Sequence, residues 1–122
     1  MTLVFVYGTL RRGGHNHRLL EHARCVSVTR TAPAFTLYDL GAYPAMVAEG
    51  VTAVEGEVYE VDATILTRLD RLEGYPDYYD RIEASLEDGH VALTYTMQPG
   101  QVLGHPTISD GRWPVRSTMR TP

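Results

Sequence analysis

Glu73 stands at a position where an amphipathic helix would carry a leucine. The segment DATILTRLDRLEG (62–74) predicts a helix that Asp62 caps at its start and that Gly74 ends. At about 100° per residue, Glu73 falls within the apolar stripe of that helix, which comprises Ile65, Leu66, Leu69 and Leu72. Burial and the partial negative charge of a helix C-terminus both disfavour an ionised carboxylate and raise its pKa. The pattern indicates an acid that accepts and donates a proton near neutral pH.

An ordinary surface role for Glu73 is the alternative that the helical pattern leaves open. If the helix ends one residue earlier, this side chain turns toward solvent or pairs with Arg81. Helix ends inferred from sequence shift by a few residues. The same carboxylate therefore has two interpretations, and other motifs must decide between them.

A second candidate site follows the apolar segment TLVFV, where the chain continues as Tyr7, Gly8, Thr9 and Leu10. Glycine lets a ligand approach the backbone closely. A strand that ends in a glycine turn exposes successive N–H groups, which can hold an anion or a carbonyl oxygen. The pair Gly13-Gly14 is placed as in a phosphate loop, but the required Lys-Ser/Thr is absent, so nucleotide binding by that route is excluded.

Other reactive residue types in the chain predict structural roles. His15, His17 and His22 do not share one face of a helix, so we expect no metal site there. Cys25 lies in an alternating segment, which favours a small core residue over a nucleophile. The composition, with no lysine, excludes Schiff-base chemistry.

The elements that must position these residues are a mixture of strands and helices. Strands are predicted at 2–10, 25–31, 34–41 and 54–61, and a hairpin over 81–97 turns at Asp88-Gly89. HNHRLLEHA (15–23) predicts a short helix that begins after Asn16, and LGAYPAMVAEG (40–50) is predicted as a loop. Glu55 and Glu57 share one face of their strand, which we expect to be solvated, with a pocket wall as the alternative.

Length and charge limit the class of protein. The 122 residues predict one domain, 1–122, whose tail from about residue 105 covers one end through Trp113 or is partly disordered. The net charge of −4 argues against a nucleic-acid partner. No apolar run reaches membrane-spanning length and a single cysteine allows no internal disulfide, so we expect a cytoplasmic protein without a membrane partner.

Five segments together resemble the γ-glutamylcyclotransferase-like family, in its AIG2-like or γ-glutamylamine cyclotransferase branch. They span most of the chain in the family's order. The segments are VFVYGTLRRGGHNHRLL (4–20), LYDLGAYPAMV (37–47), VEGEVYEVD (54–62), LDRLEGYPDYYDR (69–81) and SDGRW (109–113).

The resemblance implies both a fold and a reaction. The fold is of the α+β class, a small mixed and largely antiparallel β-barrel flanked by short helices. The reaction is cleavage of a γ-glutamyl amide by its own α-amino group, which gives 5-oxoproline and a free amine. It implies no metal and no cofactor, and a small-molecule γ-glutamyl substrate as the partner of a monomer or weak homodimer.

The resemblance also assigns roles to individual residues. Glu73 becomes the general base and acid, and Tyr79 and Arg81 match the motif that follows it. Either Tyr43 or Tyr79 would hydrogen-bond the substrate or Glu73. The expected substrate-binding residues are Tyr7, Gly8, Thr9, Leu10, Tyr43 and Tyr79. A non-catalytic small-molecule-binding module, or an amidase that uses water and releases glutamate, are the alternatives on the same fold.

Overall fold

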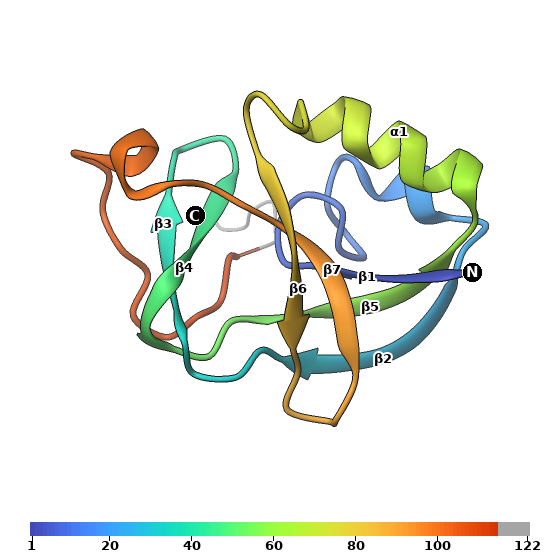
Figure 1. Ribbon diagram of the computed structural model, residues 1–122, viewed down its shortest axis with the longest axis horizontal. Coiled ribbons are helices and arrows are strands. Elements are labelled where there is room, and N and C mark those ends of the chain that lie inside the picture. The colour runs from blue at the N-terminus through green and yellow to red at the C-terminus, as the bar shows by residue number, and fades with distance from the viewer. Residues whose placement is uncertain (115–122) are drawn as a thin grey trace, which may run out of the picture.

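Seven strands, one α-helix and two 3₁₀ helices make up residues 1–114, the part of the chain that the computed structural model describes (Figure 1). The expected fraying of the last residues, 115–122, lies outside this part. In chain order the elements are β1 (Thr2–Val6), η1 (His17–Leu20), β2 (Arg24–Arg30), β3 (Phe35–Asp39), β4 (Pro44–Thr52), β5 (Glu55–Val61), α1 (Ala63–Glu73), β6 (Asp80–Ser85), β7 (Val91–Thr96) and η2 (Pro99–Val102).

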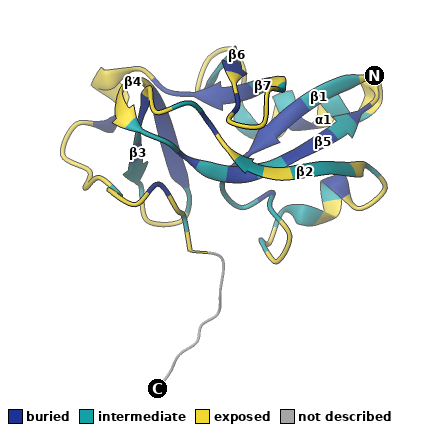
Figure 2. Cartoon of the chain, turned by 90° about the horizontal axis from the view of Figure 1, so that it is seen from below, coloured by how far each residue is buried: buried dark blue, intermediate teal, exposed yellow. Residues whose placement is uncertain are grey.

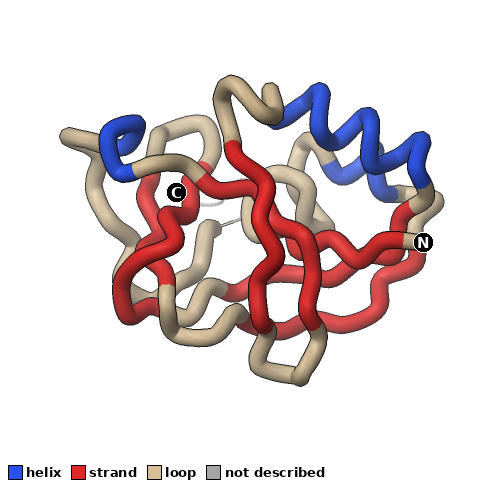
Figure 3. Tube along the Cα trace, viewed as in Figure 1, coloured by secondary structure: helices blue, strands red, loops and turns tan. Residues whose placement is uncertain are grey.

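The strands form two sheets, as the tube in Figure 3 shows. The larger sheet has the order β2-β5-β1-β7-β6, in which only β1 and β7 run parallel, and β3 pairs with β4 in a second, antiparallel sheet. The larger sheet curls so that the chain just after its edge strands β2 and β6 forms one isolated bridge, Thr31 to Leu86, but the two edge strands themselves do not pair. The predicted α+β class and the largely antiparallel pairing are confirmed, but the predicted barrel is not closed.

The central strand β1 is buried on both faces, as its continuous apolar run predicts. Val4 and Val6 pack in the core cluster that contains Leu69 of α1, whereas Phe5 packs in a second cluster with Val58. Figure 2 shows the buried colour along β1, whereas the edge strand β2 has no buried residue. The end of β1 is thereby held from both sides, which fixes the start of the loop that follows it.

The segment 40–50, predicted as a loop, contains most of strand β4. Strand β4 pairs antiparallel with β3. Asp39 lies opposite Pro44 at one end of the pairing, and Phe35 lies opposite Thr52 at the other. Glycine and proline in LGAYPAMVAEG favoured a loop, but Pro44 is the first residue of the strand, a position where its missing N–H is tolerated. The three residues that follow Pro44, Ala45, Met46 and Val47, are buried, and this burial outweighs the local turn signals.

Helix α1 begins and ends where the sequence predicts. The carboxylate of Asp62 accepts a hydrogen bond from the N–H of Ile65 at 2.8 Å, and Gly74 ends the helix in a left-handed conformation with φ = 66°. Leu69 is fully buried, but Leu72 is 42% exposed, so its predicted place in the packed stripe is wrong. The last turn extends beyond the packed face, and Leu72 lines a pocket instead.

The hairpin follows expectation: strands β6 and β7 pair antiparallel, with Gly89 in the turn at φ = 94°. The first part of the tail runs along strand β3, where the N–H of Ile108 donates to Leu37 O at 2.8 Å and the N–H of Asp39 donates to Pro106 O at 2.9 Å. Arg11 donates to Trp113 O. In residues 1–114, no helix has both the length and the apolar character needed to cross a membrane.

Candidate active site

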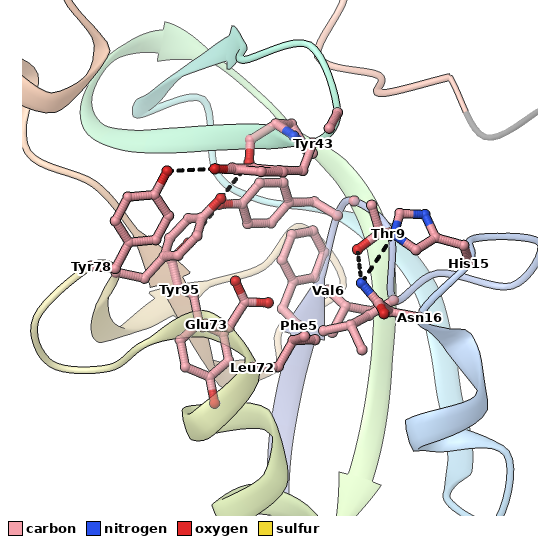
Figure 4. A pocket seen from close by; sticks show the side chains of 16 residues that line it. Phe5, Val6, Thr9, His15, Asn16, Tyr43, Leu72, Glu73, Tyr78 and Tyr95 are labelled. Carbon is pink, nitrogen blue, oxygen red and sulfur yellow. Dashed lines mark hydrogen bonds between the residues drawn. The ribbon is translucent and has the colours of Figure 1, made fainter.

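A pocket of about 320 Å³ lies where β1 ends, beside the last turn of α1 (Figure 4). Its walls come from β1 and the loop after it, the turn before β4, the end of α1 and the loop that follows, and β7. All seven residues predicted for the site line this pocket: Tyr7, Gly8, Thr9, Leu10, Tyr43, Glu73 and Tyr79. The structure thus brings together residues that are up to 72 positions apart in the sequence, counted from Tyr7 to Tyr79.

The surroundings of Glu73 favour proton transfer, because they raise the pKa of its carboxyl group toward neutral pH. The helix includes Glu73, so the alternative in which it ends earlier is wrong. The side chain is part-buried and points into the pocket (Figure 4). Burial raises the pKa of Glu73 from 4.5 to about 7. Within residues 1–114, its carboxylate accepts no hydrogen bond, and the guanidinium of Arg81 pairs with Asp70 instead, at 2.6 Å.

Burial is the cause that the structure supports for the raised pKa of Glu73. Three carbonyls of the last helical turn accept hydrogen bonds from the loop that follows: Asp70 O from the N–H of Tyr75 at 2.9 Å, Arg71 O from the N–H of Gly74 at 3.2 Å and Glu73 O from the N–H of Tyr79 at 3.2 Å. These bonds weaken the partial charge of the helix end, which acts through unsatisfied groups.

Three tyrosine rings surround Glu73, and each directs its hydroxyl proton to another acceptor. Tyr7 donates to Tyr95 O at 2.6 Å, Tyr79 donates to Pro44 O at 2.7 Å, and Tyr95 donates to Asp70 Oδ1 at 2.7 Å. Burial raises the pKa of all three phenols, and the negative charge of Glu73 adds to the rise. The rings are thus neutral walls, and Tyr79 does not donate its hydroxyl proton to Glu73.

The loop from Gly8 to Leu10 presents three consecutive backbone N–H groups without an acceptor among the described residues. The loop itself is well anchored. Gly8 O accepts from the N–H of Arg11 at 3.1 Å, and Thr9 O accepts from the N–H of Asn16 at 3.0 Å. Consecutive free N–H groups in a fixed turn suit an anion or a developing oxyanion.

Glu57, which was expected on a solvated face, forms a hydrogen bond with the chain just after this loop. Its Oε1 accepts from the N–H of Arg12 at 2.9 Å and from the hydroxyl of Tyr59 at 2.8 Å. Glu55, on the same strand, forms an ion pair with Arg112 at 3.1 Å. Neither carboxylate lines the pocket, so the alternative of a pocket wall is wrong for both.

Two further tyrosines, Tyr43 and Tyr78, line the pocket. The hydroxyls of Tyr43 and Tyr78 lie 2.5 Å apart, and their rings meet edge to face at 6.4 Å between centroids. Sequence reasoning placed Tyr43 at the site but missed Tyr78 and Tyr95. Tyr78 is adjacent to Tyr79 in a tyrosine-rich loop, which was a usable signal, whereas nothing local marks Tyr95 in the alternating strand β7.

The raised pKa predicts that Glu73 destabilises the fold above neutral pH. Between pH 4.5 and 7 the native state binds more protons than the unfolded state, so the free energy of unfolding falls as pH rises. The full shift corresponds to at most about 3 kcal/mol at pH 8. We therefore expect Glu73→Gln to stabilise the protein more at pH 8 than at pH 4, as measured by urea unfolding. The exposed Glu83→Gln is the control, and an equal gain at both pH values would contradict the prediction.

Comparison with known proteins agrees with this geometry. A protein of Vibrio cholerae serotype O1 that bears a gamma-glutamylcyclotransferase name is 46% identical over 111 residues, which cover 91% of this chain and 94% of that protein. The human gamma-glutamylaminecyclotransferase is 40% identical over 93 residues, or 66% of this chain and 59% of its own length.

The fold has a counterpart among solved structures as well. An AIG2-like protein from Mus musculus superposes with a TM-score of 0.78 at 28% identity, covering 93% of this chain and 88% of the mouse chain. Residues 4–115 match the family described as gamma-glutamyl cyclotransferase, AIG2-like. The ordered motifs, the fold and these matches agree, and the chain belongs to the gamma-glutamyl cyclotransferase, AIG2-like family.

Proposed function

We propose that this protein converts a γ-glutamyl amide into 5-oxoproline and a free amine, with Glu73 as general base and acid. The observation that carries the proposal is a carboxylate of pKa about 7, without a hydrogen-bond partner among the described residues, in the same pocket as three free backbone N–H groups. A pocket of about 320 Å³ suits a ligand the size of a γ-glutamyl group.

Glu73 carries protons between the two nitrogen atoms of the substrate. In its ionised form it accepts a proton from the α-ammonium group, and the freed α-nitrogen attacks the γ-carbonyl carbon. Glu73 then returns the proton to the departing nitrogen as the original C–N bond breaks. A second proton of the α-nitrogen follows the same route, so the amine leaves protonated and the lactam retains one N–H.

The loop after β1 and the tyrosine walls have complementary tasks. The N–H groups of Gly8, Thr9 and Leu10 are available to hold the oxyanion or the α-carboxylate of the substrate. The rings of Tyr7 and Tyr79 fold the glutamyl chain into a conformation ready for attack and limit the access of water. Intramolecular attack is thereby favoured over hydrolysis.

The lining of the pocket favours an amine, and not an amino acid, as the leaving group. No arginine is among the described residues that line it, so a second substrate carboxylate finds no guanidinium there to pair with. Tyr43 and Tyr78 offer ring faces and hydroxyls that suit an uncharged or cationic amine. The name of the human relative, gamma-glutamylaminecyclotransferase, supports the same class.

Product analysis tests the proposal. We expect 5-oxoproline and amine in equal amounts from a γ-glutamyl alkylamine, without incorporation of ¹⁸O from labelled water. A γ-glutamyl amino acid should react with a kcat/KM lower by about 5- to 150-fold, because an unpaired charge costs about 1–3 kcal/mol. Free glutamate as product would identify an amidase, and binding without turnover would identify a non-catalytic module. Either result contradicts the proposal.

A further inference from the structure

Asp70 lies one helical turn before Glu73, and both of its carboxylate oxygens are occupied. Oδ2 accepts from Nη1 of Arg81 at 2.6 Å, and Oδ1 accepts from the hydroxyl of Tyr95 at 2.7 Å. The side chains of Asp70 and Arg81 are only 23% and 24% exposed. The carboxylate therefore ties the last turn of α1 to both strands of the β6–β7 hairpin, and its geometry is fixed by two partners.

One of the two partners of Asp70, Tyr95, lies close to Glu73. The ring of Tyr95 lines the pocket beside Glu73, and its hydroxyl points away from the Glu73 carboxylate (Figure 4). The other partner, Arg81, is engaged elsewhere, with its guanidinium over the ring of Tyr75, 4.5 Å from the ring centroid. A hydrogen-bond donor within reach of an ionised carboxylate stabilises the charged form. If the hydroxyl of Tyr95 turned toward Glu73, the pKa of the acid would therefore fall.

The other groups around Glu73 are committed in ways that do not depend on Asp70. Tyr7 and Tyr79 donate to backbone carbonyls, and Tyr43 and Tyr78 bind each other. The titratable and charged groups that face this region are Tyr7 from β1, His15 from the following loop, Tyr43 from the turn before β4, Asp70 from α1, Tyr78 and Tyr79 from the loop after α1, Arg81 from β6 and Tyr95 from β7.

We propose that Asp70 is a positioning residue of this site, which holds the hydroxyl of Tyr95 away from Glu73. The acid thus remains without a partner because a second carboxylate binds the donor that would otherwise reach it. The inference rests on the proposed function in one respect, that Glu73 carries the proton. Its test measures the titration of Glu73 without substrate, so the two can fail separately.

The test follows the side-chain carboxyl carbon of Glu73 by NMR as a function of pH in ¹³C-glutamate-labelled protein. The resonance is identified by its loss in Glu73→Gln. In Asp70→Asn we expect the midpoint, about 7 in the wild type, to fall by about one pH unit or more. Tyr95→Phe alone should leave the midpoint unchanged, because its hydroxyl does not donate to Glu73. The double variant Asp70→Asn/Tyr95→Phe should regain part of the fall.

Each arm has a result that overturns the inference. An unchanged midpoint in Asp70→Asn rejects the role of Asp70, and an undiminished fall in the double variant rejects the part assigned to Tyr95. If Asp70→Asn does not fold, Tyr95→Phe decides, since a rise in its midpoint would show that the hydroxyl already donates to Glu73. The exposed Asp77→Asn, which also removes one negative charge, is the matched control and should not shift the midpoint.

Discussion

Replacing Glu73 by glutamine should lower the rate of 5-oxoproline formation by about 10²–10⁴-fold, the usual contribution of a general acid–base group. Glutamine has nearly the same shape but neither accepts nor returns a proton, so substrate binding should persist while turnover is lost. The wild-type kcat/KM should rise with pH through a midpoint near 7, because the ionised form of Glu73 starts the reaction. The residual activity of the variant should not show this midpoint.

The measurement is the pH dependence of 5-oxoproline release, followed for both proteins together with circular dichroism to verify the fold. Glu83→Gln, on the exposed side of β6, serves as the control and should retain full activity. Wild-type rates in Glu73→Gln would remove Glu73 from the mechanism and would reopen the choice between enzyme and binding module.

Replacing Gly8 by alanine should reduce kcat/KM by about 10²-fold. A Cβ atom at Gly8 would lie 2.7 Å from Cδ and 2.8 Å from Cγ of Pro44, closer than carbon atoms approach in proteins. The loop after β1 and the start of β4 must therefore move apart. A displacement of about 1 Å in a group that positions the substrate costs a rate factor of this size. The free N–H groups of the loop would no longer face the reacting atoms correctly.

The matched control for this variant is Gly100→Ala in η2, where a Cβ atom would meet nothing within 4 Å. Steady-state kinetics on both variants, with thermal unfolding to compare stability, provides the measurement. We expect the control to match the wild type in activity. Equal activity of Gly8→Ala and wild type would show that the loop is not a close-fitting part of the site.

The local features of the site were predictable, because local sequence determines them. The side chain of Asp62 and the left-handed conformation of Gly74 set the two ends of α1 within a few residues of chain, and helical geometry then turns Glu73 inward. The glycine loop could be predicted for the same reason. Its turn is closed by the hydrogen bond from the N–H of Arg11 to Gly8 O.

The features that were missed depend on pairing between distant segments. Strand β4 forms because it pairs with β3 and because Met46 O accepts from the N–H of the distant Met97, and these contacts override the turn signals of Gly41 and Pro44. Tyr95 reaches the pocket only because β7 lies parallel to β1. The hydroxyl of Tyr79 was expected, as one of two candidates with Tyr43, to hydrogen-bond the substrate or Glu73, and it donates to Pro44 O, 35 residues away. A single sequence does not reveal which distant carbonyl accepts such a proton.

The parallel pairing of β1 with β7 has a consequence for biosynthesis. Val4, near the beginning of the chain, is aligned with Leu93, so β1 cannot acquire its second neighbour until about four-fifths of the described chain, 93 of 114 residues, has been synthesised. Contacts between such distant residues make closure of the structure a late event. The loop that carries Gly8 extends from this same strand. Nascent chains that stop before β7 should therefore lack a formed pocket, and catalytic competence should arise in one late step during synthesis.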